Sequence, residues 1–398
     1  MLQQTILNKI ISEYATPAYV FDETSLIDRI RQLRSHLPKE LKLCYAMKAN
    51  PFLTKTMSRL TDRLEVCSPG EYEVCIREHI DPSMIVVSGV NKTMESMSRI
   101  FLYSNGAGIY TVESPAHYDI LKTCAANAGV RINILLRLSS GNQFGMDKPA
   151  LLALLKSMRN EENVNILGIH FYGGTQKTYK KMQAEISMLA ELGTELNRLG
   201  FDNLEMEYGP GLYVPYFKDD NNELMKPVNE LSQCLPQLNM YPNITIELGR
   251  YLAAFSGYYI TRVMDVKHTN NSHYLIVDGG IHQINYYGQM LGMKLPYIRH
   301  IRSDIKADES ASSDIDWTVC GSLCTANDIL VRKLRLESPS VSDMLVFERC
   351  GAYSITEGMA LFLSRELPQV LLVGNDGTIE VMRRLTDTYP FNDRSCNY

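Results

Sequence analysis

The position of Lys48 in the sequence would allow its side-chain amine to react. It lies in the motif YAMKANP, directly after an apolar run and before an Asn-Pro pair that ends the strand. A lysine amine withdrawn from water has a lowered pKa and can form a Schiff base with an aldehyde. A surface lysine at a strand end is the alternative, so the neighbouring motifs must decide between the two.

Glu247 and Arg250 lie three residues apart in ITIELGRYLAA, at the end of another apolar run. A carboxylate facing a pyridine nitrogen and a guanidinium facing a phosphate are what an aldehyde cofactor such as pyridoxal phosphate (PLP) requires. In EYGPGLYVPYF, Gly209 and Gly211 would let the backbone approach that phosphate closely. A structural ion pair and a plain turn are the alternatives for these two motifs.

Two further motifs carry a possible acid or base. His170, in GIHFYGGTQ, can stack on a cofactor or transfer a proton, although a buried core histidine fits the same pattern. Cys324, in CGSLCTANDIL, precedes Asp328 by four residues, and a thiol beside a carboxylate can protonate an intermediate. A core thiol and a helix-capping Asp are the alternative. No His or second cysteine pair lies near Cys320 and Cys324, which argues against a zinc site.

Short β-type runs alternate with segments of helical periodicity between about residues 20 and 255, and this pattern predicts a (β/α)8 barrel. Amphipathic helices are predicted around Leu26–Leu33 and Met182–Leu199, the second closing at Gly200. In such barrels the chemistry lies after the carboxyl ends of the strands, where Lys48 and Glu247 fall. The eight runs are Leu43–Met47, Arg63–Cys67, Met84–Val87, Ile109–Val112, Ile132–Leu138, Ile166–Phe171, Leu204–Tyr208 and Ile244–Leu248.

The pattern changes after Arg250. GYYITRVMDVKH, a turn at Asn270 and Asn271, and HYLIVDGG predict a β-hairpin, and WTVCGSLC, DMLVFERC and GTIEVMRRL predict further strands. We therefore expect a barrel domain over residues 20–255 and a mostly antiparallel β domain over 256–398 together with 1–19. Loop-like composition occurs at Lys218–Asn222 and Ser303–Asp316.

Composition excludes several classes of protein. The 398 residues are 45% hydrophobic and 21% charged, as in ordinary globular proteins. Lys and Arg number 40 against 45 Asp and Glu, so no basic surface for nucleic acid is expected. Nine cysteines without a CxxC pair suggest reduced thiols. With no apolar run long enough for a bilayer and no secretory signal at the start, the sequence predicts a cytoplasmic protein.

Eight motifs occur in a characteristic order: AMKAN, SPGE, SGVNK, GIHFYGGTQ, ELGR, VDGG, GSLCTAND and GAYS. In this order they resemble the fold-type III PLP-dependent decarboxylases, which include diaminopimelate decarboxylase, ornithine decarboxylase and decarboxylases of siderophore and antibiotic pathways. The resemblance covers roughly residues 15 to 375. It implies a PLP-dependent α-decarboxylase of an amino acid, made of a barrel and a β domain and working as a homodimer.

The resemblance also implies roles for individual residues. Lys48 would carry PLP covalently, His170 would stack on its ring, and Glu247 would bind the ring nitrogen. Arg137 would lie behind the ring near Lys48. Cys324 would protonate the product carbon beside the substrate-binding Asp328, and both would come from the partner subunit of a head-to-tail dimer. The phosphate would be held by Gly209, Gly211, Gly249, Arg250 and Tyr353.

Three departures from the family pattern bear on the substrate. Tyr213 stands where another phosphate-loop glycine is common, and the segment VDGGIHQINYYGQ lacks the arginine typical of diaminopimelate enzymes. Thr325 follows the cysteine where diaminopimelate enzymes have Glu and ornithine enzymes Asp. The first change affects how the phosphate is held, whereas the missing arginine and Thr325 favour a substrate whose distal end is acidic or conjugated, with Thr325 lining its pocket. The alternative is meso-diaminopimelate, lysine or ornithine, with Asp328 receiving the distal ammonium.

Three rival functions remain from the residues alone. An alanine-racemase-like isomerase shares the barrel and lysine but would use a tyrosine in place of Cys324. A catalytically inactive regulatory homologue is disfavoured by intact Lys48, Glu247 and Cys324. A single-domain PLP carrier would leave the β domain without a role.

Overall fold

The chain folds into two compact units, each described by itself. The barrel unit comprises residues 30–214 and 223–252, and the β unit comprises residues 1–29, 215–222 and 253–398. The computed structural model describes residues 2–104, 106–159, 161–221, 223–286, 292–303 and 314–394. The predicted domain boundaries near residues 20 and 255 stay predictions.

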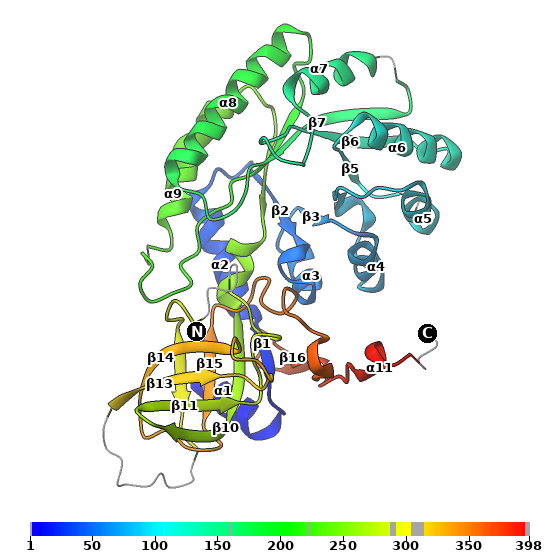
Figure 1. The fold of residues 1–398 in the computed structure, drawn as a ribbon. Coiled ribbons are helices and arrows are strands. Elements are labelled where there is room, and N and C mark those ends of the chain that lie inside the picture. The colour runs from blue at the N-terminus through cyan, green and yellow to red at the C-terminus, as the bar shows by residue number, and fades with distance from the viewer. Residues whose placement is uncertain are drawn as a thin grey trace. The chain divides into compact units, whose positions relative to one another are not determined.

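Eight parallel strands close the barrel in chain order (Figure 1). The ring closes where β2 pairs with β9, with Lys42 opposite Thr245. All eight predicted β runs are strands, which confirms the predicted barrel. The strands are β2 (Lys42–Ala46), β3 (Arg63–Val66), β4 (Ile85–Val87), β5 (Ile109–Val112), β6 (Ile132–Arg137), β7 (Val164–Tyr172), β8 (Glu205–Gly209) and β9 (Ile244–Leu248).

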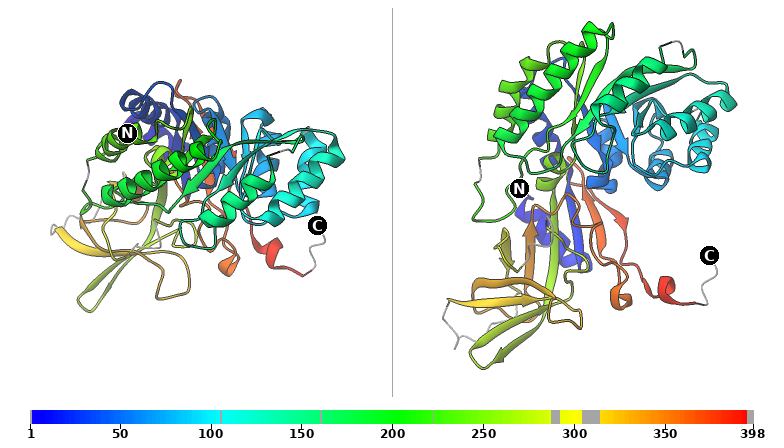
Figure 2. Two further views of the ribbon diagram at one scale, coloured as in Figure 1. Left: turned by 90° about the horizontal axis from the view of Figure 1, so that it is seen from above. Right: turned by 45° about the horizontal axis from the view of Figure 1, so that its top comes forward.

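Helices lie outside the ring of strands (Figures 1 and 2). Their starts follow from local chemistry, since Ser68, Ser114 and Asp147 each cap a helix by accepting a hydrogen bond from a first-turn backbone N–H. The predicted Met182–Leu199 helix is α8, and Gly200 after it has φ of +81°, the left-handed conformation that ends helices. The helices are α2 (Glu23–His36), α3 (Thr54–Ser58), α4 (Pro69–Arg77), α5 (Met94–Ser104), α6 (Pro115–Ala128), α7 (Lys148–Ser157), α8 (Tyr179–Arg198), α9 (Lys226–Cys234) and α10 (Arg250–Ala253).

The barrel interior is unusually polar. Such interiors are normally filled by Val, Ile and Leu, and a small apolar layer of this kind consists of Cys44, Val86, Ile109 and Leu135. Alternate residues of a strand face the same side of the sheet. The period-two spacing of charged residues in RLEV of β3 and EMEYG of β8 therefore places several of them on one face. This arrangement supplies the candidate site.

The β unit is a nine-stranded sheet of order β14-β13-β11-β10-β1-β16-β17, in which β15 also pairs with β10 and β12. Most pairings are antiparallel, as predicted, whereas β1–β16 and β11–β13 are parallel. Helix α1 (Gln4–Glu13) packs Leu7 and Ile10 into the core of this unit. The strands are β1 (Ala18–Asp22), β10 (Gly257–Thr269), β11 (Ser272–Val277), β12 (Ile298–Ile301), β13 (Asp314–Cys320), β14 (Ile329–Glu337), β15 (Met344–Glu348), β16 (Gln369–Val373) and β17 (Ile379–Arg383).

The predicted hairpin is β10–β11, with its turn at Asn270, whose φ is +53°. The loop predicted for Ser303–Asp316 falls mostly outside the described residues, and its last residues, from Asp314, already belong to β13. Of the loop predicted at Lys218–Asn222, residue 222 is not described, and Lys218 donates its backbone N–H to Leu295.

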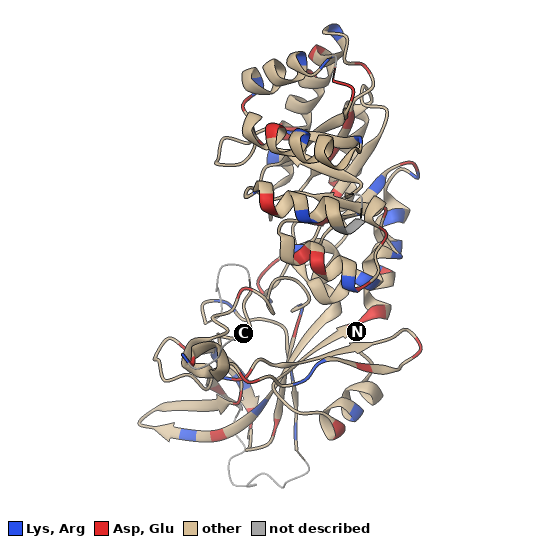
Figure 3. Ribbon diagram, turned by 90° about the vertical axis from the view of Figure 1, so that its right-hand side faces the viewer, with Lys and Arg blue, Asp and Glu red and all other residues tan. Residues whose placement is uncertain are grey.

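Charged side chains of both signs are interleaved along the helices of the barrel unit (Figure 3). This agrees with the small net charge of -5. Within the described residues, no helix combines the length and the apolar character needed to cross a membrane.

Candidate active site

Lys48 lies in a short 3₁₀ turn, Met47–Ala49, directly after β2. The turn ends at Asn50, whose side chain accepts a hydrogen bond from Phe52 N and starts the next turn. The Nζ of Lys48 donates to Glu65 Oε2 over 2.6 Å and lies 3.8 Å from Glu247 Oε1. The amine therefore lies between carboxylates from β3 and β9, and Glu65 can accept the proton that an amine must lose before it attacks an aldehyde.

Two further side chains surround this amine. The Sγ of Cys67 lies 3.6 Å from Lys48 Nζ, and the ring of Tyr172 has its centroid 5.8 Å from the same nitrogen. Burial, followed by the charge of Glu65, raises the pKa of Cys67 well above its ordinary value. Cys67 is therefore a neutral thiol, and it donates to Glu65 Oε1.

His170 and Glu247 form a buried pair. The Nε2 of His170 donates to Glu247 Oε2 over 2.8 Å, across β8, which separates their strands. Burial alone would raise the pKa of Glu247, but the Lys48 charge and the hydrogen bond from His170 outweigh it and lower that pKa to about 2. Glu247 is thus an ionised carboxylate in a water-poor site, which is what stabilises a protonated pyridine nitrogen.

Arg137 ends β6 opposite His170 in the register. Its guanidinium donates to Glu113 Oε1 over 3.0 Å, and Glu113 Oε2 accepts from the backbone N–H of Gly145. The charge of Arg137 also contributes to the lowered pKa of Glu247. Arg137 is therefore a fixed, paired cation beside the His170–Glu247 pair.

The loops after β7, β8 and β9 approach one another closely enough to require glycine. Gly211 has φ of +58°, and a Cβ there would lie 2.1 Å from Gly174 O. A Cβ on Gly249 would lie 2.9 Å from Ala49 Cβ. In the same region Arg250 Nε donates to Thr175 Oγ1 over 3.3 Å.

Gly209 has the same constraint, since a Cβ at this position would lie 2.4 Å from Tyr172 Cδ2. Its carbonyl accepts from Lys177 Nζ over 2.9 Å, and Lys177 also pairs with the buried Glu185. These contacts fix the loop after β8 against the loop after β7.

The set of donors fits PLP. Lys48 offers an amine for the aldehyde, ionised Glu247 offers a partner for the ring nitrogen, and glycine-containing loops with Arg250 offer backbone N–H groups and a cation for the phosphate. The buried Nδ1 of His170 has no partner among the described residues.

The other predicted site residues, Cys324, Thr325, Asp328 and Tyr353, belong to the β unit. Cys324 is exposed on the loop between β13 and β14. Asp328 is buried and closes that loop, because Oδ2 accepts from Leu323 N over 2.7 Å and Oδ1 from Ile281 N over 2.8 Å. Tyr353 has φ of +66°, a conformation rarely adopted by bulky residues.

Sequence reasoning missed Glu65, Cys67 and Tyr172. The sequence does contain a signal for the first two. Polar residues alternate with apolar ones at Arg63, Glu65 and Cys67, in a run that otherwise has the composition of a buried strand. Tyr172 ends the β7 run that contains His170, and alternation puts both on one side of the strand.

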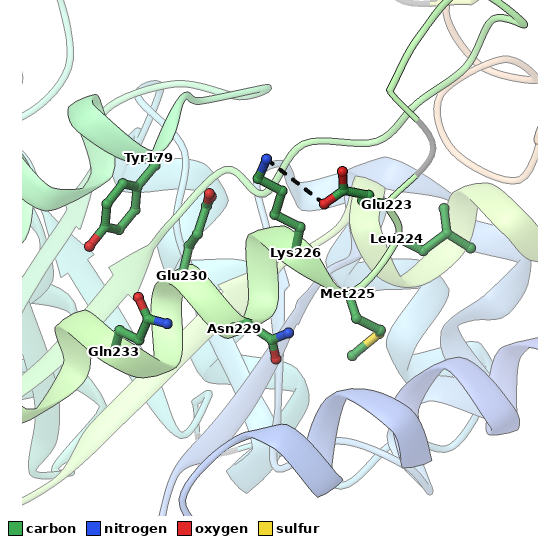
Figure 4. A pocket seen from close by; sticks show the side chains of 8 residues that line it. All are labelled: Tyr179, Glu223, Leu224, Met225, Lys226, Asn229, Glu230 and Gln233. Atoms are coloured by element: carbon green, nitrogen blue, oxygen red, sulfur yellow. Dashed lines mark ion pairs between the residues drawn. The ribbon is translucent and has the colours of Figure 1, made fainter.

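A separate pocket of about 540 Å³ lies between the start of α8 and α9 (Figure 4). None of the predicted site residues lines it. Of its charged lining residues Glu223, Lys226 and Glu230, the first two pair with each other at 3.8 Å. We therefore assign the chemistry to the barrel mouth and not to this pocket.

The pyridoxal-binding domain of the pyridoxal-dependent decarboxylases matches residues 23–254, which is more than half of the chain. The chain therefore belongs to the pyridoxal-dependent decarboxylases. It is a PLP-dependent carboxy-lyase, as its sequence motifs indicated.

Three curated relatives show how wide this family is. The diaminopimelate decarboxylase of Methanocaldococcus jannaschii is 25% identical, over 95% of this chain and 91% of its own length. The L-glutamyl-[BtrI acyl-carrier protein] decarboxylase of Niallia circulans is 25% identical, over 96% and 94%. The 2-[(L-alanin-3-ylcarbamoyl)methyl]-2-hydroxybutanedioate decarboxylase of Staphylococcus aureus is 24% identical, over 89% and 93%.

The fold agrees with a solved structure of the same family. The diaminopimelate decarboxylase from Helicobacter pylori complexed with L-lysine superposes with a TM-score of 0.81 at 22% identity, covering 96% of each chain. This similarity confirms the fold class, a closed parallel barrel together with a separate, mostly antiparallel sheet.

We predict that PLP is attached to Lys48. Borohydride reduction of the PLP-loaded protein should abolish its visible absorbance and leave the cofactor on the peptide that contains Lys48, as determined by mass spectrometry. Lys92, which also follows a barrel strand and is more deeply buried than Lys48, is the internal control and should stay unmodified. Recovery of the cofactor on another lysine would contradict the assignment.

Glu247 should make stability depend on pH. Its pKa falls from the ordinary 4.5 to about 2 on folding. A carboxyl group whose pKa is lower in the folded than in the unfolded protein stabilises the fold above pH 4.5. This contribution to stability is lost as the pH falls towards 2. Replacing Glu247→Gln in the cofactor-free protein should therefore lower the melting temperature most above pH 5, and the difference from wild type should shrink below pH 4.5. A difference in melting temperature that did not change with pH would show that these partners do not keep Glu247 ionised.

Proposed function

We propose that the enzyme removes the α-carboxylate from an amino acid whose distal end is acidic or already conjugated, in a specialised biosynthetic pathway. The observation that carries this proposal is the composition of the loop that bears Cys324. Between Gly321 and Asp328 the only acid is Asp328 itself, and Thr325 follows the cysteine. A distal ammonium would need a carboxylate, because leaving such a charge unpaired in a dry pocket costs several kcal/mol.

Asp328 is poorly placed to supply that carboxylate. Both of its oxygens accept backbone N–H groups, from Ile281 and Leu323, and its side chain is buried. Burial raises the pKa of Asp328, and the two backbone hydrogen bonds and the charge of Arg365 oppose that rise. The hydrogen-bonding capacity of Asp328 is therefore used to hold its own loop.

A cation suited to a distal carboxylate lies near the same loop. Arg365 is exposed and forms no ion pair with any other described residue. Burial, followed by the charge of Arg365, lowers the pKa of His282 to about 4. His282 is therefore a neutral group with two buried ring nitrogens that lack partners among the described residues. Neutral donors and a free guanidinium match a carbonyl, amide or carboxylate better than an ammonium.

The relatives include both kinds of substrate. Two of them carry names that denote a carrier-bound glutamyl group and a conjugated amino acid, and another is named for diaminopimelate. Their identities to this chain lie between 24% and 25%. Decarboxylation of meso-diaminopimelate, lysine or ornithine is therefore the alternative that kinetics must test.

For the reaction itself, the proposed roles follow the site. Bound PLP supplies an electron sink for the carbon that loses CO2. Lys48 attaches the cofactor, Glu247 keeps a proton on its ring nitrogen, and His170 packs against its ring. Cys324 delivers the proton that replaces the carboxylate. Arg137 lies behind the ring near Lys48, and the phosphate is held by Gly209, Gly211, Gly249, Arg250 and Tyr353.

We further propose a cytoplasmic homodimer in which the loop that bears Cys324, held in shape by Asp328, serves the partner's site. An exposed apolar patch on the β unit supports this assembly. Asn392 Nδ2 donates to Leu361 O over 2.9 Å and so holds helix α11 (Tyr389–Asn392) beside the segment 359–363. Contiguous exposed apolar groups of this kind mark interaction surfaces. The patch consists of Met359, Leu361, Phe362, Leu363, Tyr389 and Phe391.

Substrate preference is tested by measuring kcat/KM for meso-diaminopimelate, lysine and ornithine beside a panel of acylated or citrylated diamino acids and carrier-linked glutamate. We expect efficient turnover only in the second group. Replacing Thr325→Glu should raise the activity on free diamino acids, and Thr325→Ser is the matched control. Turnover of a free diamino acid above about 10⁴ M⁻¹s⁻¹ by the natural enzyme, as for a dedicated enzyme, would refute the conjugate hypothesis.

Shared sites are tested by mixing two inactive variants. Lys48→Ala and Cys324→Ala should each be nearly inactive but should regain at most about a quarter of native activity after subunit exchange, because half of the dimers then carry one intact site. Phe362→Asp in the apolar patch should weaken the dimer in sedimentation experiments. If exchange is proven and no activity returns, each site is built within one chain.

A further inference from the structure

Lys177 joins two loops of the barrel unit. It lies after β7, in the segment GGTQK, and its side chain is only 1% exposed. Its Nζ donates to Gly209 O over 2.9 Å, and its backbone N–H donates to Gly211 O, also over 2.9 Å. A single residue of the loop after β7 therefore holds two carbonyl groups of the loop after β8.

The ammonium group of Lys177 is fixed by further partners in the interior. Glu185 of α8 accepts from it over 2.5 Å, and the same carboxylate oxygen accepts from Tyr208 Oη over 2.9 Å. The rings of Tyr172 and Tyr208 have their centroids 5.6 and 5.3 Å from the nitrogen. Burial lowers the pKa of Lys177, and the charge and hydrogen bond of Glu185 oppose that fall.

The contact that an apolar side chain could not provide is the hydrogen bond to Gly209 O. A buried ion pair often stabilises a fold no better than apolar residues of similar volume do. A buried carbonyl oxygen, in contrast, requires a donor. Gly209 and the following Pro210 are both buried, so Lys177 takes the place of water as that donor.

The neighbouring residue holds the far end of the same loop. Gln176 Oε1 accepts from Val214 N over 2.6 Å, and Gln176 Nε2 donates to Val214 O over 2.9 Å. Two consecutive residues, Gln176 and Lys177, thus fix the loop at positions 209, 211 and 214.

This loop also carries two backbone N–H groups that have no acceptor among the described residues, those of Gly211 and Leu212. Leu212 is buried, and unpaired N–H groups in a protein interior are rare. The peptide bond between them is trans, so the N–H of Leu212 points away from the Gly211 carbonyl that Lys177 holds. Unpaired N–H groups of one turn are the donors with which backbones bind anions.

The side chain of Lys177 bears on the first of these N–H groups through Pro210. The hydrogen bond to Gly209 O fixes the peptide unit that precedes the proline. The proline ring then fixes the next backbone angle, φ, near about -65°. The direction of the Gly211 N–H is therefore largely set by the contact between Lys177 and Gly209.

We propose that Lys177 is a positioning residue for the cofactor phosphate. It keeps the negative ends of the Gly209 and Gly211 carbonyls away from the anion and leaves the N–H groups of Gly211 and Leu212 to bind it. Because its own charge is paired with Glu185, Lys177 acts through the loop and not as a phosphate ligand. This inference rests on the assignment, proposed above, of the phosphate to the loop of Gly209 and Gly211.

The experiment compares the affinity of the cofactor-free, full-length protein for PLP with its affinity for pyridoxal, which keeps the ring and aldehyde but lacks the phosphate. Lys177→Met retains an unbranched side chain and removes the donor to Gly209 O. It should bind PLP about tenfold more weakly than the natural protein, since hydrogen bonds to a charged group are worth this much. Its affinity for pyridoxal should stay that of the natural protein.

Lys181→Met is the matched control. Lys181 also donates to a glycine carbonyl, Gly173 O, over 3.0 Å, but it is exposed, so water can replace it. This variant should bind PLP and pyridoxal as the natural protein does. An equal loss of PLP affinity in Lys181→Met would overturn the proposal.

A merely structural role for Lys177 predicts a different result. Lys177→Met would then have a lower melting temperature and would bind both ligands equally less well, or both unchanged, and either result would contradict the proposal. The phosphate assignment itself is tested by the natural protein alone. If that protein bound PLP no more tightly than pyridoxal, the assignment would be wrong and the role of Lys177 would be lost with it.

Lys177→Met leaves Glu185 buried without its cation, which can prevent folding. In that case the double variant Lys177→Met, Glu185→Gln removes both charges and keeps an acceptor for Tyr208 Oη. It should show the same selective loss of affinity for PLP over pyridoxal. An unchanged affinity for PLP in this folded variant would refute the positioning role.

Discussion

The carboxylate of Glu247 is the group on which the site depends. It lies between the Lys48 ammonium and the His170 ring, and these partners lower its pKa to about 2 although the side chain is buried. A buried carboxylate without them would take up a proton and would lose the charge that a pyridinium nitrogen needs. The elements of the barrel unit hold Glu247 together with Lys48 and His170.

The barrel supports the arrangement because several of its strands bring polar side chains into contact with one another. Lys48 follows β2, Glu65 lies in β3, His170 in β7 and Glu247 in β9. Hydrophobic packing is also supplied by the apolar layer of Cys44, Val86, Ile109 and Leu135 and by the buried sides of the helices, such as that of α8. The polar interior is therefore tolerated because the apolar packing that stabilises the barrel does not depend on it.

Much of this was predictable from the sequence. The eight β runs, the hairpin at Asn270 and the polar residues at strand ends were identified because alternation and turn chemistry are local properties. The pairing of β1 with β16 and the contacts of Arg63 with β8 were not, since strands and side chains far apart in the chain leave no local signal of which partner they meet. Asp328 shows the limit within a single motif. The family resemblance implies that it binds substrate, which stays a prediction, and nothing in the sequence indicated that its oxygens accept the backbone N–H groups of Ile281 and Leu323.

The clamp that Asp328 forms on its loop also bears on substrate specificity. The loop is held through the backbone N–H groups of Leu323 and Ile281, which donate to Asp328. The side chain at position 325 adds a single hydrogen bond, which Thr325 Oγ1 accepts from Asn327 N over 3.3 Å. In the proposed enzyme, where Thr325 lines the substrate pocket, a substitution at that position would change the chemistry offered to the distal end of the substrate while the Asp328 clamp keeps its hold on the loop that bears the thiol. The choice of substrate and the decarboxylation step would then depend on separate parts of one loop.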